Sequence, residues 1–125
     1  MDTKTFFTNY WEAQVKKDKE AFLGYFHADA VIYLHDSNDV LKPEHYLTDD
    51  FGGDWHTTVD RIDKLENGQI VTTTFHRSSD WTGFTTSFFT VKNDVITELH
   101  EYFSPCDDNI VPQWRTDLAE HEIVK

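Results

Sequence analysis

The sequence predicts an α+β domain, in which N-terminal helices lie on one face of a curved, largely antiparallel β-sheet. Apolar residues recur at helical spacing near the start of the chain, and long segments with strand character occupy the region after residue 55. Helices followed by a run of strands are the element order of an α+β fold. The 125 residues suffice for one domain and leave no room for a second, so we expect a single domain over residues 1–125.

Two short helices open the chain. The first is predicted by an apolar stripe at three- and four-residue spacing, made of Phe6, Phe7, Tyr10, Trp11 and Val15. Asp18 is then placed to cap a second helix, whose buried face consists of Ala21, Phe22, Tyr25 and Phe26. A third helix is expected to begin near Pro43, because the fixed φ of proline suits a first helical turn, and to run to about Phe51.

The strands are predicted from β-branched and aromatic content and from the turn signals between them. A first strand covers Ala30–His35, and Asp36–Asp39 is a turn or loop. A meander follows, with strands over Trp55–Leu65, Gln69–Arg77, Phe84–Lys92 and Val95–Phe103. Asn67-Gly68 is a strong hairpin signal and Asn93-Asp94 a further turn, whereas the segment 107–125 has no clear pattern.

The composition excludes several classes of partner. The chain has 11 Lys and Arg against 23 Asp and Glu, a formal net charge of −12, which repels nucleic acid and anionic lipid. A single cysteine, Cys106, excludes an internal disulfide, and no apolar run approaches the ~20 residues that span a bilayer. The first ten residues lack the basic and apolar regions of a signal peptide, so we expect a cytoplasmic protein.

Three stretches, taken together and in order, carry a resemblance to a known family. They are Lys17–Ala30 (KDKEAFLGYFHADA), the Asn67-Gly68 hairpin with the long strands after it, and Ile96–Ser104 (ITELHEYFS). In this order they resemble the nuclear transport factor 2-like superfamily, in particular its SnoaL-like and ketosteroid-isomerase-like branch. The resemblance implies a cone-shaped, cystatin-like architecture, in which a curved antiparallel or mixed sheet wraps around the N-terminal helices. It also implies an apolar pocket at the wide end and homodimerisation through the outer sheet face.

The resemblance places the isomerase-like site residues only in part. Tyr10 falls at the position of the tyrosine that donates to an oxyanion. Leu34 falls at the position of the proton-shuttling aspartate, with Asp36 two residues beyond it, and Ser87 falls at the position of the second acid. Both isomerase acids are therefore missing, and steroid isomerisation by that mechanism is not expected.

The same resemblance turns two sets of alternate strand residues inward. They are Leu99, Glu101 and Phe103 on the last strand, and Thr72, Thr74 and His76 on an earlier one. A carboxylate facing an apolar cavity would have a raised pKa and could both take and give a proton, and a histidine beside it, either His76 or His100, would complete an acid–base pair. Such a pair serves enolisation, dehydration or aldol cyclisation. The alternative is that Glu101 pairs with a cation or points to solvent.

The expected ligand is a flat or hydrophobic small molecule, because aromatic residues make up 15% of the chain and several must line any pocket. We expect Glu101, His76 and Tyr10 as catalytic residues, and the substrate-binding set to be Leu34, Asp36, Trp55, Thr74, Ser87, Phe89, Leu99 and Phe103. No histidine or cysteine spacing typical of a metal site occurs, and nothing in the local sequence supports a site made of His56, His76 and Glu101. We therefore expect no metal and no cofactor.

Two functions remain open on these observations. The first is an isomerase, cyclase or dehydratase that works by acid–base chemistry on a hydrophobic small molecule. The second is a non-catalytic module of the same superfamily, which binds a ligand in the cavity or a partner on the outer sheet face. A homodimer is expected from the resemblance and from the outward apolar set Val71, Phe75 and Phe88.

Overall fold

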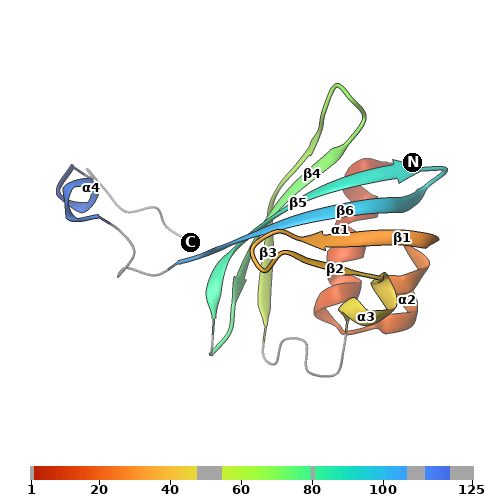
Figure 1. Ribbon diagram of the computed structural model, residues 1–125, viewed down its shortest axis with the longest axis horizontal. Coiled ribbons are helices and arrows are strands. Elements are labelled where there is room, and N and C mark those ends of the chain that lie inside the picture. The colour runs from red at the N-terminus through yellow and green to blue at the C-terminus, as the bar shows by residue number, and fades with distance from the viewer. Residues whose placement is uncertain (1, 48–54, 80, 107–111, 119–125) are drawn as a thin grey trace.

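Six strands form one open sheet in the part of the chain that the computed structural model describes, residues 2–47, 55–79, 81–106 and 112–118. They are β1 (Phe26–Leu34), β2 (Asp39–Leu41), β3 (His56–Lys64), β4 (Ile70–Arg77), β5 (Thr82–Lys92) and β6 (Val95–Pro105). Their order is β2-β1-β6-β5-β4-β3, and all neighbours are antiparallel except the parallel pair β1 and β6. The sheet is therefore mixed, and its strands twist across its width (Figure 1).

Three helices, α1 (Thr3–Val15), α2 (Lys19–Gly24) and α3 (Pro43–Tyr46), lie against one face of this sheet (Figure 1). The carboxylate of Asp18 accepts a hydrogen bond from the backbone nitrogen of Ala21 at 3.1 Å, so the predicted cap of α2 is present. The apolar face of α1 is buried, and the indole nitrogen of Trp11 donates to Thr72 Oγ1 of β4 at 3.2 Å. This arrangement confirms the predicted α+β class. A fourth helix, α4 (Gln113–Leu118), has every residue exposed and stands apart from the sheet (Figure 1).

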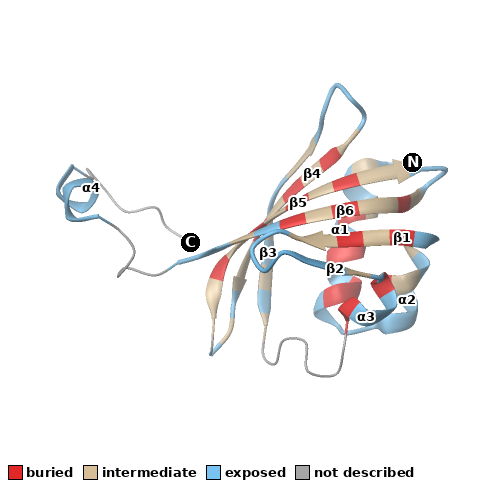
Figure 2. Cartoon of the chain, in the orientation of Figure 1, coloured by how far each residue is buried: buried red, intermediate tan, exposed pale blue. Residues whose placement is uncertain are grey.

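The helix-covered face of the sheet is unusually polar at its centre. Alternate residues are buried along β4, β5 and β6, as Figure 2 shows by the spacing of its red segments. Several of these inward residues carry hydroxyl or carboxyl groups, namely Thr72, Thr74, Thr85, Ser87 and Glu101. Buried polar groups need hydrogen-bond partners, so this centre requires a polar network where an ordinary core would be apolar.

Four details differ from the predicted elements. β1 begins at Phe26 instead of Ala30, because the chain joins the sheet directly after α2, where the Ile96 nitrogen donates to the Tyr25 carbonyl at 2.8 Å. The predicted loop over 36–39 ends in a short strand, β2, which pairs with β1 once Asn38 reverses the chain with a φ of 59°. β5 begins two residues earlier than expected and β6 ends two residues later. The third helix ends at Tyr46, because Leu47 already has extended backbone angles, and the remainder predicted up to Phe51 lies outside the described residues.

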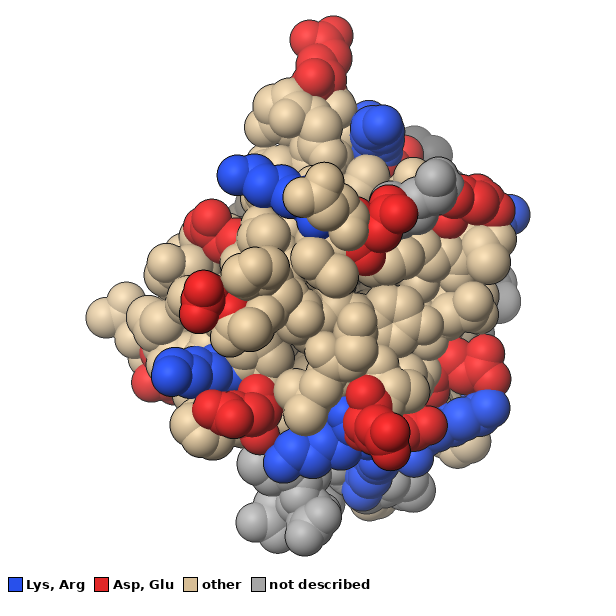
Figure 3. Space-filling view, turned by 90° about the vertical axis from the view of Figure 1, so that its right-hand side faces the viewer, with Lys and Arg blue, Asp and Glu red and all other residues tan. Residues whose placement is uncertain are grey.

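Charged side chains of both signs are interspersed over the face seen in Figure 3. The acidic side chains visible on this face are separated by basic and uncharged ones instead of forming a single patch. No helix in the described ranges is long and apolar enough to cross a membrane.

Candidate functional site

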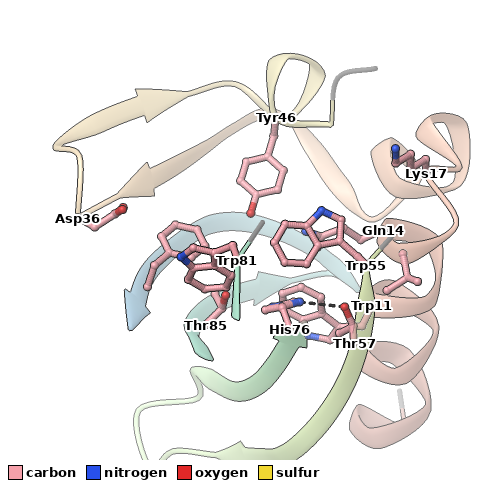
Figure 4. Close-up of a pocket in the computed structure, with 12 residues that line it drawn as sticks. Trp11, Gln14, Lys17, Asp36, Tyr46, Trp55, Thr57, His76, Trp81 and Thr85 are labelled. Atoms are coloured by element: carbon pink, nitrogen blue, oxygen red, sulfur yellow. Dashed lines mark hydrogen bonds between the residues drawn. The ribbon is translucent and has the colours of Figure 1, made fainter. Parts of the chain in front are cut away.

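A cavity of about 280 Å³ lies at one end of the molecule, where α1, α3 and the inner face of the sheet meet (Figure 4). Its described lining comes from the end of α1, the turn after β1, α3, and the strands β3 to β6 with the segments beside them. The described lining residues are Trp11, Gln14, Val15, Lys17, Asp36, Tyr46, Trp55, Thr57, His76, Trp81, Thr85 and Phe103. The charged side chains of Lys17 and Asp36 lie on opposite sides of it (Figure 4).

Aromatic rings make most of the cavity wall. Three of the chain's four tryptophans line it, together with Tyr46 and Phe103. The ring centroids of Trp55 and Trp81 are 5.8 Å apart in an edge-to-face arrangement. Trp81 packs directly over Gly83, where a Cβ atom would come within 2.6 Å of the indole, so glycine is what allows this ring to take its place. Such walls suit a flat, apolar molecule.

His76 is a titratable side chain that β4 places on this wall. Thr57 of β3 lies opposite it, and the Nδ1 of His76 is 2.9 Å from the Thr57 hydroxyl, while its Nε2 is 2.8 Å from the hydroxyl of Thr74. Burial lowers the pKa of His76 from 6.5 to about 4. The imidazole is therefore neutral at pH 7, so one ring nitrogen donates a hydrogen to its threonine hydroxyl and the other accepts with its lone pair.

Glu101 is a fully buried carboxyl behind the wall. Ser87 lies directly opposite it on β5 and donates to Glu101 Oε2 at 2.6 Å, while the hydroxyl of Tyr46 donates to Oε1. Burial raises the pKa of Glu101 and Asp36 adds to the increase, while the hydrogen bonds from Ser87 and Tyr46 act in the opposite direction. Its partners are thus two hydroxyl groups and not the cation that the alternative interpretation required.

Tyr10 lies deeper in the core and is not among the described lining residues. Its ring packs against Phe7, Phe22 and Phe89 at centroid distances of 6.2, 5.6 and 5.2 Å, and its hydroxyl has no hydrogen-bond partner. Burial, and then the nearby Glu101, raise its pKa well above 10.0. Its role as an oxyanion donor stays a prediction.

The other predicted site residues fall into three groups. Asp36, Trp55 and Phe103 line the cavity. Thr74 and Ser87 are buried behind it, each hydrogen-bonded to a predicted catalytic residue. Leu34, Phe89 and Leu99 belong to the apolar core or pack against it.

The two other histidines considered in the sequence analysis, His100 and His56, are not among the described residues that line the cavity. His100 points to the outer face, where it hydrogen-bonds Glu98 at 2.5 Å and His35 at 2.8 Å, so it cannot pair with the inward Glu101 of the next position. His56 is exposed on β3, and the described residues contain no group of three or more His, Cys, Asp or Glu that could hold a metal ion.

Tyr46 and Gln14 were missed by the sequence reasoning. Tyr46 follows Pro43 by three residues in a four-residue helix, and nothing local marks it as functional. Gln14 carried a usable signal, because it is a buried polar side chain that continues the apolar stripe of α1 three residues after Trp11.

Comparison with known proteins supports the fold. No protein-family model matches the sequence, and no protein of curated function matches it. Solved structures do: a candidate ketosteroid isomerase from Kribbella flavida is 18% identical, with a TM-score of 0.78 over 98% of this chain and 91% of that chain. A candidate polyketide cyclase from Streptomyces antibioticus is 16% identical, with a TM-score of 0.69 over 94% and 100% of the two chains.

A third similar structure holds a small molecule. It is a protein with a ketosteroid isomerase-like fold from Catenulispora acidiphila, in complex with trimethylamine, 14% identical with a TM-score of 0.65 over 79% of this chain and 85% of that chain. Together these likenesses confirm the predicted resemblance at the level of the fold, which is that of nuclear transport factor 2-like, ketosteroid isomerase-like and SnoaL-like proteins.

Proposed function

We propose that this protein is an acid–base enzyme of the isomerase, cyclase or dehydratase type, acting on a hydrophobic small molecule that carries a carbonyl group. The observation that carries the proposal is the pair of titratable groups at one aromatic cavity: a neutral imidazole, His76, on its wall and a buried carboxyl, Glu101, one hydroxyl group away from it. Burial of either group costs desolvation free energy, and titratable groups perturbed in this way cluster at functional sites.

The two groups suit opposite halves of an enolisation. The unprotonated nitrogen of a neutral His76 can exchange its threonine hydrogen bond for a proton from the carbon next to a carbonyl, and the acid side of the cavity supplies a proton to the carbonyl oxygen. Both groups belong to the chain itself, so this chemistry calls on no cofactor. Isomerisation, aldol cyclisation and dehydration all pass through such a step.

Exchange of α-hydrogens tests the proposal without knowledge of the natural substrate. The probe is 2-tetralone, a flat bicyclic ketone, and its α-hydrogens are followed by proton NMR in D₂O. We expect the protein to accelerate exchange over buffer and His76→Gln to lower the rate by about 10²-fold or more. Trp114→Phe is the matched control, because this residue lies on the exposed α4 outside the cavity. Exchange that is equally fast in His76→Gln contradicts the assignment.

The non-catalytic alternative also has an observation in its favour. Glu101 is not among the described lining residues, and a protein of similar fold holds trimethylamine. The same experiment separates the two functions, because saturable quenching of tryptophan fluorescence by 2-tetralone without any exchange selects a binding module.

We further propose that the protein forms a homodimer through the outer sheet face. The rings of Phe75 and Phe84 lie 5.1 Å apart there, and those of Phe88 and Tyr102 lie 5.8 Å apart. Tyr102 has 45% of its surface exposed, so this face offers aromatic area that a second copy would cover.

A further inference from the structure

Tyr46 is the link between the cavity and the buried carboxyl. Its ring enters the cavity from α3 with the hydroxyl end pointing inward (Figure 4). Only 7% of the surface of Tyr46 is exposed. Its hydroxyl donates to Glu101, which lies 55 positions later in the chain. The two oxygens of Glu101 accept from Tyr46 and Ser87. Of these two donors, Tyr46 is the one among the described lining residues.

Glu101 cannot meet a ligand directly. Its side chain has no exposed surface, and each of its oxygens already accepts a hydroxyl donor. Tyr10 is no better placed, because it does not line the cavity. A proton from the acid side must therefore pass through a hydroxyl that touches both Glu101 and the cavity.

We propose that the Tyr46 hydroxyl is the group that donates to the carbonyl oxygen of a ligand in the cavity, and that Glu101 is a positioning residue that acts through it. This inference rests on the proposed function, since it names the acid side of the same site. It also replaces Tyr10, the tyrosine expected from the sequence, as the hydroxyl that contacts the ligand.

The proton balance of the step is closed within the site. As His76 takes a proton from the α-carbon, the electron pair of that C–H bond moves to the carbonyl oxygen. The step starts from protonated Glu101, whose O–H then donates to the Tyr46 oxygen, so that the Tyr46 hydrogen is directed to the ligand. Tyr46 gives this proton to the carbonyl oxygen and receives the proton of Glu101, which becomes a carboxylate. Ketonisation of the enol at another carbon reverses both transfers, so the site returns to its starting protonation state.

The contact is tested first without turnover. The probe is 2,2-dimethyl-1-tetralone, a ketone that has no α-hydrogen, and its carbonyl stretch is recorded by infrared difference spectroscopy at saturating ligand. We expect the stretch in the wild-type complex to lie at a lower wavenumber than in apolar solvent, and the shift to be lost in Tyr46→Phe. Ser87→Ala is the matched control, because it removes the other hydrogen bond to Glu101 and leaves Tyr46 in place. The shift should persist in that variant.

A carbonyl that is unshifted in the wild type, or equally shifted in Tyr46→Phe, overturns the inference. Because Tyr46→Phe leaves a buried carboxyl with one donor fewer, the comparison is repeated between Glu101→Gln and the double variant Glu101→Gln/Tyr46→Phe, in which no buried charge is left unpaired. This measurement involves no catalysis, so a failure of the proposed enzymatic function does not affect it.

The action of Glu101 through Tyr46 is tested by exchange of 2-tetralone. We expect Tyr46→Phe and Glu101→Gln each to lower the rate by about 10²-fold, and the double variant to lose little more than either, as for groups that act in series. The alkaline fall of the wild-type rate should vanish in both single variants. Losses that multiply in the double variant, or an alkaline fall that survives in Tyr46→Phe, contradict a role of Glu101 through Tyr46.

Discussion

The neutral state of His76 has a consequence for stability that does not depend on any ligand. Folding lowers the pKa of this imidazole from 6.5 to about 4, because the ring is buried between two threonine hydroxyls and the cavity wall. In the unfolded chain it takes up a proton as the pH falls through 6.5, whereas in the folded chain it does so only near pH 4. Above pH 6.5 the imidazole is neutral in both states and does not reduce the free energy of unfolding. As the pH falls from 6.5 to about 4, the unfolded chain is favoured by protonation and the free energy of unfolding decreases.

The size of this loss follows from the two pKa values. A difference of one unit in pKa between the folded and unfolded states corresponds to about 1.36 kcal/mol. The change in the pKa of His76 from 6.5 to about 4 therefore corresponds to roughly 3 kcal/mol. The figure is an upper bound, because the ring is only half-buried and water screens part of the effect.

Urea unfolding at a series of pH values measures it. We compare the wild type with His76→Gln, whose amide can still bond both threonines but does not titrate. Other groups titrate in both proteins, so the difference between their unfolding free energies isolates His76. This difference should move in favour of the variant by up to about 3 kcal/mol between pH 7.5 and pH 4. His56→Gln, the same replacement on an exposed strand residue, controls for the loss of an imidazole as such.

NMR titration of the histidine ring protons gives an independent reading, with the His76 signal assigned by its absence from His76→Gln. A midpoint near 6.5 for this signal, or an unfolding difference that stays constant from pH 7.5 to pH 4, would show that the site does not hold a neutral imidazole. The proposed base would then lose its physical basis.

Three further outcomes are expected. Because folding raises the pKa of Glu101, wild-type stability falls as the pH rises from 4.5 through the folded-state pKa. Urea unfolding should show the stability of Glu101→Gln increasing relative to the wild type by up to about 1.36 kcal/mol per pH unit over this range. A relative increase toward low pH contradicts this. Gly83→Ala should lower the unfolding free energy by about 1–3 kcal/mol and alter Trp81 fluorescence, because its Cβ meets that ring at 2.6 Å, whereas Gly24→Ala, with open space around its Cβ, should be neutral or slightly stabilising. Light scattering at micromolar concentration should find a dimer that Phe88→Asp converts to monomer, and a monomeric wild type refutes the interface.

The element order could be predicted because it depends on short-range pattern. The spacing of Phe7, Tyr10 and Trp11 predicted α1, and the Asn67-Gly68 signal agrees with a turn in which Gly68 adopts a φ of 88°. The inward phase assigned to Leu99 and Glu101 agrees with their burial. These features follow from periods of 3.6 and 2 residues, which a single sequence displays.

The hydrogen-bond contacts within the site could not be predicted in the same way. The contact between Tyr46 and Glu101 joins residues 55 positions apart, and it exists only because α3 returns over the end of the sheet. Whether a buried carboxyl meets a cation, a hydroxyl or a cavity is decided by which element covers it, and that choice leaves no local trace in the sequence. The expected Tyr10 donor shows the limit, since its position on α1 was correctly read as inward but its hydroxyl stops short of the cavity lining.

Burial acts on the two titratable groups of the site in opposite directions, and this is what lets them work together. In water a carboxyl of pKa 4.5 gives its proton to an imidazole of pKa 6.5, and the pair becomes two ions whose roles are exchanged, a carboxylate base and an imidazolium acid. Here burial lowers the pKa of the imidazole to about 4 and raises that of the carboxyl, so both shifts favour the neutral base and the neutral acid that the proposed step uses. The burial that encloses the cavity therefore also shifts both groups toward the protonation states that the proposed chemistry requires. A rate plateau bounded below by a pKa near 4 and above by the pKa of Glu101 is the expected signature, and a profile that rises through pH 6.5 is incompatible with it.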